Sequence, residues 1–231
     1  MSRRADLDRL YELLYRLESK FGGRRVLSQC NGRMNWPKHG VYFFFEPSEL
    51  RACDAQARIV RVGTHALKAG ARSTLWGRLA QHRGTQQLVG GNHRGSIFRL
   101  LVGAALAARS PDLACPTWGS GSSAKRSIRE NERHLEAAVS EYIGGMTVLW
   151  LPMEDEPGSD SLRGYIEKNT IALLSNFEQL PVDPPSANWL GGYCPRAKVQ
   201  HSGLWNSNHV DEDYDPAFLN ELERMVEGSS S

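Results

Sequence analysis

The chain has 231 residues, of which 40% are hydrophobic and 23% charged, which gives no sign of a disordered or fibrous protein and suits one globular domain with additions. No apolar run approaches the roughly 18 residues that a bilayer-spanning helix needs, and residues 1–10 lack the apolar segment of a secretion signal, so we expect a cytoplasmic protein without a membrane partner. The formal net charge of +2 hides an asymmetry, because residues 1–110 carry 19 Lys and Arg against 7 Asp and Glu, whereas residues 111–231 carry 9 against 19.

Hydrophobic periodicity and capping residues predict a mixture of helices and short strands. Apolar residues three and four apart indicate amphipathic helices, whereas short β-rich runs bounded by polar residues indicate strands. In chain order we expect a helix at 6–21, strands at 41–45 and 58–63, helices at 74–83, 96–109 and 125–142, a strand at 146–153, and helices at 162–176 and 216–227. This order favours an α+β or mixed α/β domain, in which helices cover a small sheet.

Two of the predicted helices carry polar side chains that suit chemistry. Arg78 and His82 lie four residues apart on one helix face, where a cation beside an imidazole suits an anionic ligand; an ordinary solvated face is the other interpretation. Glu167 lies at the edge of the apolar stripe of its helix, so its carboxylate partly leaves water and needs a cation. That cation is either a structural arginine, which the sequence alone favours, or a metal ion such as Mg²⁺.

The first half of the chain also has features that suit nucleic acid. Sixteen of its 19 basic residues are arginine, whose planar guanidinium group matches phosphate. A glycine-rich loop at 84–95 brings His93 and Arg94 to the start of the helix at 96–109, where free backbone N–H groups favour an anion. We take these two residues and His65, which follows the second strand, as candidate nucleic-acid-binding residues. The alternatives are an ordinary glycine-rich loop and a bipolar surface whose halves neutralise each other.

Taken in order, these features resemble the GIY-YIG nuclease family. The resemblance spans residues 38–178, about 60% of the chain. It rests on Gly40-Val41-Tyr42, Arg61-Val62-Gly63, Leu75-Trp76-Gly77-Arg78-Leu79, His82, Glu167 and Asn176. A triplet such as Gly-Val-Tyr is common in strands, so the order of the pieces carries the resemblance, together with the predicted element on which each piece falls.

The resemblance implies a fold and an activity. The fold would be a three-stranded antiparallel sheet flanked by helices at 38–178, with an N-terminal helical extension at 1–37 and a C-terminal wrap and short helix at 179–231. The activity would be that of an endonuclease, a hydrolase that cuts DNA phosphodiester bonds with one divalent metal ion, Mg²⁺ or Mn²⁺, while RNA stays open as a substrate. The charge asymmetry also leaves open a homodimer, in which the acidic half of one copy covers the basic site of the other.

The resemblance also implies a role for each site residue. Tyr42 would hold or deprotonate the attacking water, Arg78 would bind the scissile phosphate, and Glu167 would be the sole protein carboxylate on the metal ion. His82 and Asn176 match accessory positions, where the first assists the water or the phosphate and the second supports the site. These roles suit phosphodiester cleavage, which builds negative charge on phosphate oxygens.

Arg61 departs from the family pattern, which has a tyrosine at this position. One interpretation is that Arg61 has become a second phosphate ligand beside Arg78, and we favour it because the other main site residues are all present. Another is that catalysis has been lost, which leaves a non-catalytic nucleic-acid-binding module that retains the fold. A third is a different alignment of the second motif.

Overall fold

A computed structural model of the chain describes residues 2–85, 90–158 and 160–229. Residues 86–89 of the glycine-rich loop expected at 84–95 lie outside the described residues. In chain order the helices and strands are α1 (Arg3–Lys20), β1 (Arg25–Val26), β2 (Gly40–Leu50), β3 (Ala57–Gly63), α2 (Leu75–Arg83), α3 (Ile97–Arg109), α4 (Arg126–Asn131), α5 (Arg133–Gly145), β4 (Thr147–Pro152), α6 (Leu162–Leu174), α7 (Ala197–Ser202) and α8 (Phe218–Gly228).

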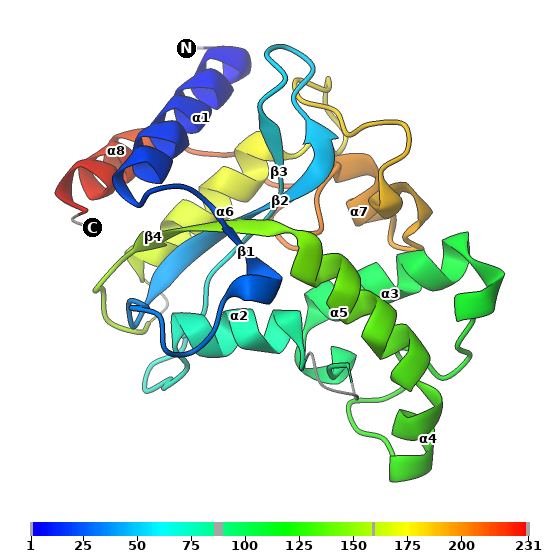
Figure 1. Ribbon diagram of the computed structural model, residues 1–231. Helices are drawn as coiled ribbons and strands as arrows, with labels where there is room; N and C mark the ends of the chain where they lie inside the picture. The colour runs from blue at the N-terminus through cyan, green and yellow to red at the C-terminus, as the bar shows by residue number, and fades with distance from the viewer. Residues whose placement is uncertain (1, 86–89, 159, 230–231) are drawn as a thin grey trace.

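The sheet is antiparallel throughout, with the strand order β1-β4-β2-β3 (Figure 1). β2, β3 and β4 are the three strands that the sequence predicts, and the α+β class is confirmed. β1 is an addition of two residues that pairs with the start of β4. A strand of two residues is too short to show an alternating pattern, which is why periodicity does not reveal it.

Two apolar cores lie on the two faces of this sheet. Along β2, Val41 and Phe43 join the core formed with α1, α6 and α8, whereas Tyr42 and Phe44 join the core formed with α2, α3 and α5 (Figure 1). Successive residues of a strand face opposite ways, so a strand covered on both faces needs an almost continuous apolar run. The helices α2 and α6, which carry Arg78, His82 and Glu167 of the predicted site, therefore pack on opposite faces of the sheet.

The first and last helices, α1 and α8, lie side by side and carry opposite charges (Figure 1). Arg9 pairs with Glu223 at 2.7 Å, and Arg16 pairs with Glu223 at 3.0 Å and with Glu227 at 2.9 Å. Leu10 of α1 and Leu222 of α8 are both fully buried in the core beneath these pairs. Part of the charge asymmetry between the two halves of the sequence is therefore neutralised within one chain.

The starts of α2 and α6 match the helices expected at 74–83 and 162–176, whereas α1 begins at Arg3, before the expected start, and α6 ends at Leu174. The side chains of Thr74 and Ser161 each accept a hydrogen bond from the N–H three residues later, at the starts of α2 and α6, and so satisfy a donor that the first helical turn leaves unpaired. The helix expected at 125–142 is instead two helices, α4 and α5. They meet at Glu132, whose carboxylate forms an ion pair with Arg94.

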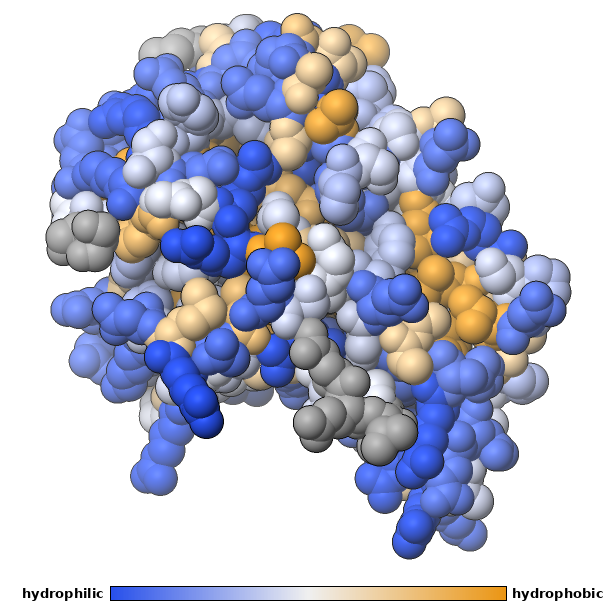
Figure 2. Space-filling view, in the orientation of Figure 1, coloured by the Kyte–Doolittle hydropathy of each residue, from blue (hydrophilic) through white to orange (hydrophobic). Residues whose placement is uncertain are grey.

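The visible surface is mainly polar. Hydrophilic residues cover most of the face seen in Figure 2, and apolar residues form small groups between them. Within the described ranges, no helix combines the length and the apolar character that crossing a bilayer requires.

Candidate active site

A cleft of about 840 Å³ opens where β3 ends and the chain continues toward α2. Its walls come from α2 and α6, on opposite faces of the sheet, and from the irregular segment at 206–209. Five of the predicted site residues line it, namely Tyr42, Arg61, His65, Arg78 and Glu167. The fold thus gathers a phenol, two guanidinium groups, an imidazole and a carboxylate from separate elements into one cleft.

The hydroxyl group of Tyr42 belongs to a buried chain of hydrogen bonds. Tyr42 Oη lies 2.8 Å from His82 Nε2, and His82 Nδ1 lies 2.7 Å from Ser96 Oγ. Ser96 is the N-cap of α3, and its Oγ also accepts a hydrogen bond from the Arg99 N–H. His82 is fully buried and does not line the cleft, so this predicted site residue is linked to the cleft through its hydrogen bond to the Tyr42 hydroxyl group.

His82 is neutral in this setting. Burial, and after it the positive charge of Arg61, holds the pKa of His82 well below its usual range, because the imidazolium form loses its stabilisation by water. A neutral imidazole has one donor nitrogen and one acceptor nitrogen. In the tautomer whose Nδ1–H donates to Ser96, His82 Nε2 accepts the Tyr42 O–H. The phenol oxygen then accepts from donors on the cleft side, where the Arg61 guanidinium group already forms a hydrogen bond with it.

Arg61 is a buried cation beside the cleft. Its guanidinium group lies 4.7 Å from the ring centre of Phe98 and donates a hydrogen bond to the Trp205 carbonyl. Arg61 Nε is buried and has no hydrogen-bond partner among the described residues. Burial lowers the pKa of Arg61, and the field of Tyr42 opposes this shift. A buried guanidinium group with an unused donor suits a bound anion.

Arg78 extends from α2 into the cleft and is held in place by two acceptors. One is the side-chain oxygen of Gln81, one helical turn further on, and the other is the Gly95 carbonyl, at 3.2 Å. A guanidinium group that is fixed before a phosphate arrives needs little rearrangement when the phosphate binds. Arg78 is therefore positioned as the more accessible of the two cations.

Glu167 supplies the carboxylate of the cleft from the α6 wall. Its Oε1 accepts a hydrogen bond of 3.0 Å from the Thr64 N–H, just after β3. Burial raises the pKa of Glu167, and the positive charge of Arg61 opposes that shift. The buried ion pairs among the described residues include Arg51–Asp183, Arg58–Glu49 and Arg99–Glu136. None of the ion pairs of the described residues contains Glu167, so the structural salt bridge that the sequence favoured is not found.

The donor set of the cleft fits a hard divalent cation that takes few protein ligands. Glu167 is the only carboxylate among the described lining residues, and no cluster of three or more His, Cys, Asp or Glu in the described chain could hold a metal ion. Mg²⁺ commonly binds one or two protein carboxylates and completes its shell with water and phosphate oxygens. The cleft therefore suits an ion shared with a phosphate substrate and does not suit a zinc site.

The two strand motifs lie next to one another in space. Tyr42 of β2 is paired with Gly63 of β3, and Phe44 with Arg61, so the two strand motifs form one hairpin. A family model described as a GIY-YIG domain matches residues 1–231, the whole chain. The chain belongs to the GIY-YIG domain family. GIY-YIG domains are typically nucleases, which act on nucleic acid. Neither the curated proteins nor the solved structures gave a match to this chain.

Asn176 lies outside the cleft of this GIY-YIG domain. It follows α6, its backbone N–H donates to the Ser202 carbonyl at 3.0 Å, and its side-chain amide donates to the Asp183 carbonyl at 3.2 Å. It does not line the cleft. Asn176 instead holds the chain that leads to the cleft-lining segment 206–209, so any support that it gives to the site is indirect.

His65 lines the cleft but carries no charge near neutral pH. Its Nε2 lies 3.3 Å from the Lys38 carbonyl. Burial lowers the pKa of His65 to about 4, because the charged imidazole would lose its hydration. The expected contact with nucleic acid would therefore come from a neutral ring and not from a cation.

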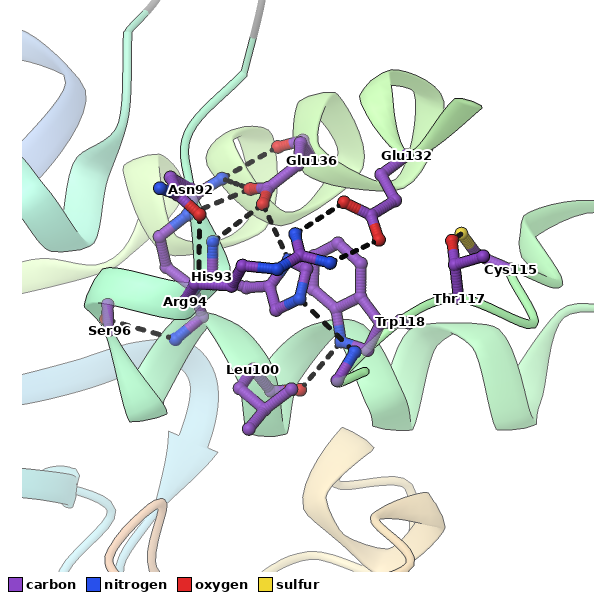
Figure 3. Close-up of polar contacts among 12 residues, drawn as sticks. Asn92, His93, Arg94, Ser96, Leu100, Cys115, Thr117, Trp118, Glu132 and Glu136 are labelled. Carbon is purple, nitrogen blue, oxygen red and sulfur yellow. Dashed lines mark hydrogen bonds and ion pairs between the residues drawn. The ribbon is translucent and has the colours of Figure 1, made fainter. Parts of the chain in front are cut away.

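His93 and Arg94 lie in a separate polar cluster (Figure 3). His93 Nδ1 lies 2.9 Å from Glu136, Arg94 pairs with Glu132 at 2.6 Å, and the His93 ring stacks on Trp118 with ring centres 3.8 Å apart. These contacts hold the loop before α3 against α5. These two of the three side chains predicted to bind nucleic acid are therefore engaged by carboxylates, and neither lines the cleft.

Sequence reasoning missed the contribution of the C-terminal segment 206–209 to the cleft. Asn206 accepts from the Val62 N–H at 3.1 Å and donates to the Val62 carbonyl at 2.8 Å, so a side chain occupies the place of a neighbouring strand. Such a contact has no periodic signature. Lys68 and Arg72 also line the rim, and their position between Arg61 and Arg78 was the only sequence signal for them.

Proposed function

We propose that this GIY-YIG protein is a divalent-metal-dependent endonuclease that hydrolyses DNA phosphodiester bonds. The proposal is carried by the convergence of Tyr42, Arg61, Arg78 and Glu167 on one cleft. Hydrolysis of a phosphodiester builds negative charge on the phosphate oxygens, so it needs cations that are already in place. Two arginines and a carboxylate suited to a metal ion supply them.

Each of these residues has a task in the proposed reaction. Arg61 and Arg78 would bind the oxygens of the scissile phosphate. Tyr42, with its own proton directed to His82, would accept a hydrogen bond from the attacking water and aim it at phosphorus. Glu167 would hold Mg²⁺ or Mn²⁺, which when bound neutralises phosphate charge and lowers the pKa of a coordinated water.

Gly63 makes room for the Tyr42 ring in this arrangement. A Cβ added at residue 63 would lie 2.3 Å from Tyr42 Oη, a separation that real Cβ atoms do not show. Gly63→Ala is therefore expected to displace the phenol and to lower the cleavage rate by about 10²-fold, the cost of a misplacement near 1 Å. Gly145→Ala is the matched control, because nothing lies within 4 Å of a Cβ at that position. Equal cleavage rates for both variants would show that Gly63 is not needed to position the Tyr42 ring for cleavage.

Removal of the metal ion tests the proposal directly. Purified protein incubated with supercoiled plasmid and Mg²⁺ is expected to yield nicked and linear DNA. Excess EDTA should stop the conversion, and added Mg²⁺ or Mn²⁺ should restore it. An RNA of the same sequence, incubated in parallel, decides between the two substrates.

The alternative function is a non-catalytic module that binds nucleic acid in the same cleft. It is motivated by Arg61, which replaces the tyrosine of the family pattern and is tied to the Trp205 carbonyl. This module would bind DNA without metal and with strong salt dependence, because only phosphate contacts and counterion release would drive binding. Binding without cleavage in either Mg²⁺ or Mn²⁺ would favour the alternative over the nuclease.

A further inference from the structure

The segment that carries His209 is fixed to the edge of β3. The Trp205 N–H donates to the Val60 carbonyl at 2.7 Å, and Asn206 bonds both backbone groups of Val62. Just beyond, the hydroxyl group of Ser175 donates to the Val210 carbonyl at 2.6 Å. His209, between these anchors, lines the same cleft as Tyr42 and Glu167.

His209 has an unfavourable backbone conformation. Its φ angle is 63°, in the left-handed region that side-chain-bearing residues seldom adopt. Such a conformation persists only where the surroundings enforce it, and it is concentrated at functional sites. Here the anchors on either side enforce it and turn the imidazole to the cleft wall.

The imidazole of His209 is held through one nitrogen only. Its Nδ1 lies 2.7 Å from Glu212 Oε1, and the second oxygen of Glu212 pairs with Lys168 at 2.8 Å. Lys168 and then His209 hold the pKa of Glu212 below its usual range, so Glu212 is ionised and accepts the Nδ1–H. Within the described residues Nε2 has no hydrogen-bond partner, and the side chain is 33% exposed. Lys168 follows Glu167 on α6, and Glu212 contacts both Lys168 and His209. His209 is therefore attached to the α6 side of the cleft.

We propose that His209 is the proton donor to the leaving sugar oxygen, an inference that rests on the nuclease function proposed above. In an in-line displacement the attacking and leaving oxygens lie on opposite sides of phosphorus. Tyr42 is tied through His82 to α2, whereas His209 is tied through Glu212 and Lys168 to α6. The two walls therefore offer one group for the attacking water and one for the leaving oxygen.

The step balances as a simple hydrolysis. The water oxygen forms a bond to phosphorus and releases one proton to solvent at the Tyr42 wall. The bond from phosphorus to the leaving oxygen breaks, and its electron pair stays on that oxygen. The proton on His209 Nε2 moves to this oxygen, the nitrogen keeps the electron pair of the N–H bond, and the second proton stays on His209 Nδ1, which still donates to Glu212. Solvent then returns one proton to His209.

A change of leaving atom tests this role. His209→Gln is expected to slow cleavage of ordinary DNA by at least about 10²-fold, as loss of a general acid does. Oligonucleotides whose bridging oxygen at one defined phosphodiester is replaced by sulfur, on the 3′ or the 5′ side, provide a leaving group that needs no proton. On the substrate whose leaving atom is sulfur, His209→Gln should cut within a few-fold of the wild-type rate.

The controls separate this proposal from the nuclease proposal itself. An equal defect on oxygen and sulfur substrates, or no defect on either, would overturn the role of His209 while the wild-type protein still cuts. A wild-type protein that cuts neither substrate would overturn the nuclease function instead. His134→Gln, at an exposed position on α5, is the matched control, and a thermal unfolding curve for each variant shows that it is folded.

Discussion

Glu167→Gln is expected to lower the rate of DNA cleavage by about 10³-fold or more and to leave the fold and DNA binding intact. Glutamine keeps the shape of the side chain and can still accept the Thr64 N–H that Glu167 Oε1 accepts at 3.0 Å. It removes the negative charge, which is what would hold the metal ion. The effect is large because no second carboxylate lines the described cleft.

The stability of the same variant gives an independent check. Burial raises the pKa of Glu167, so its ionised form destabilises the folded protein at every pH above the unfolded pKa of a glutamate. A neutral glutamine removes that cost, and the melting temperature at pH 7 should stay equal or rise. Glu141→Gln, at an exposed position on α5, controls for the loss of one negative charge. Cleavage by Glu167→Gln at the wild-type rate would rule out the metal role.

Arg61→Met is expected to separate activity from stability. Removal of one of the two cations proposed to bind the phosphate should lower the cleavage rate by about 10²- to 10³-fold. Arg61 is buried, and its Nε is unpaired within the described residues, so an apolar side chain of similar length relieves a desolvation cost. Loss of the bond to the Trp205 carbonyl acts the other way. The free energy of unfolding should therefore stay within about 2 kcal/mol of wild type.

Arg58→Met is the matched comparison in the same strand. Arg58 is also buried, but it pairs with Glu49 at 2.9 Å and donates to the Gly203 carbonyl at 2.7 Å. Its replacement leaves the Glu49 carboxylate buried without a cation, which costs about 3–5 kcal/mol. Urea unfolding of both variants measures the difference. An Arg61→Met protein that cuts normally but unfolds as readily as Arg58→Met would make Arg61 a structural residue.

The sequence predicts the scaffold of the site better than its surroundings. The runs around Tyr42 and Arg61 are apolar enough to predict paired, buried strands, and the register of that hairpin puts Tyr42 beside Gly63. Thr74 and Ser161 mark the starts of the helices that bring Arg78 and Glu167 to the cleft. These features are local, and local patterns of polarity and capping encode them.

The rest of the site depends on contacts between distant residues, which one sequence does not reveal. His93 lies in a glycine-rich loop at a helix start, a pattern that suits an anion, but its partner is Glu136, more than 40 residues away in the chain. Asn206 and His209 lie in an irregular segment and reach the cleft only because Asn206 bonds the edge of β3. No periodicity marks such residues, and only the folded chain shows which polar side chains are already used.

The hydrogen bonds from Trp205 and Asn206 to β3 determine how much of the chain must accompany the motif residues if the edge of the sheet is to stay covered. A fragment that ended at residue 178 would contain Tyr42, Arg61, Arg78, His82, Glu167 and Asn176. It would also present β3 as an open sheet edge, because the backbone groups of Val60 and Val62 would lose the hydrogen-bond partners that Trp205 and Asn206 supply. Open edges pair readily with other chains, so a fragment that keeps these motif residues covers the edge of β3 only if it also includes the C-terminal segment.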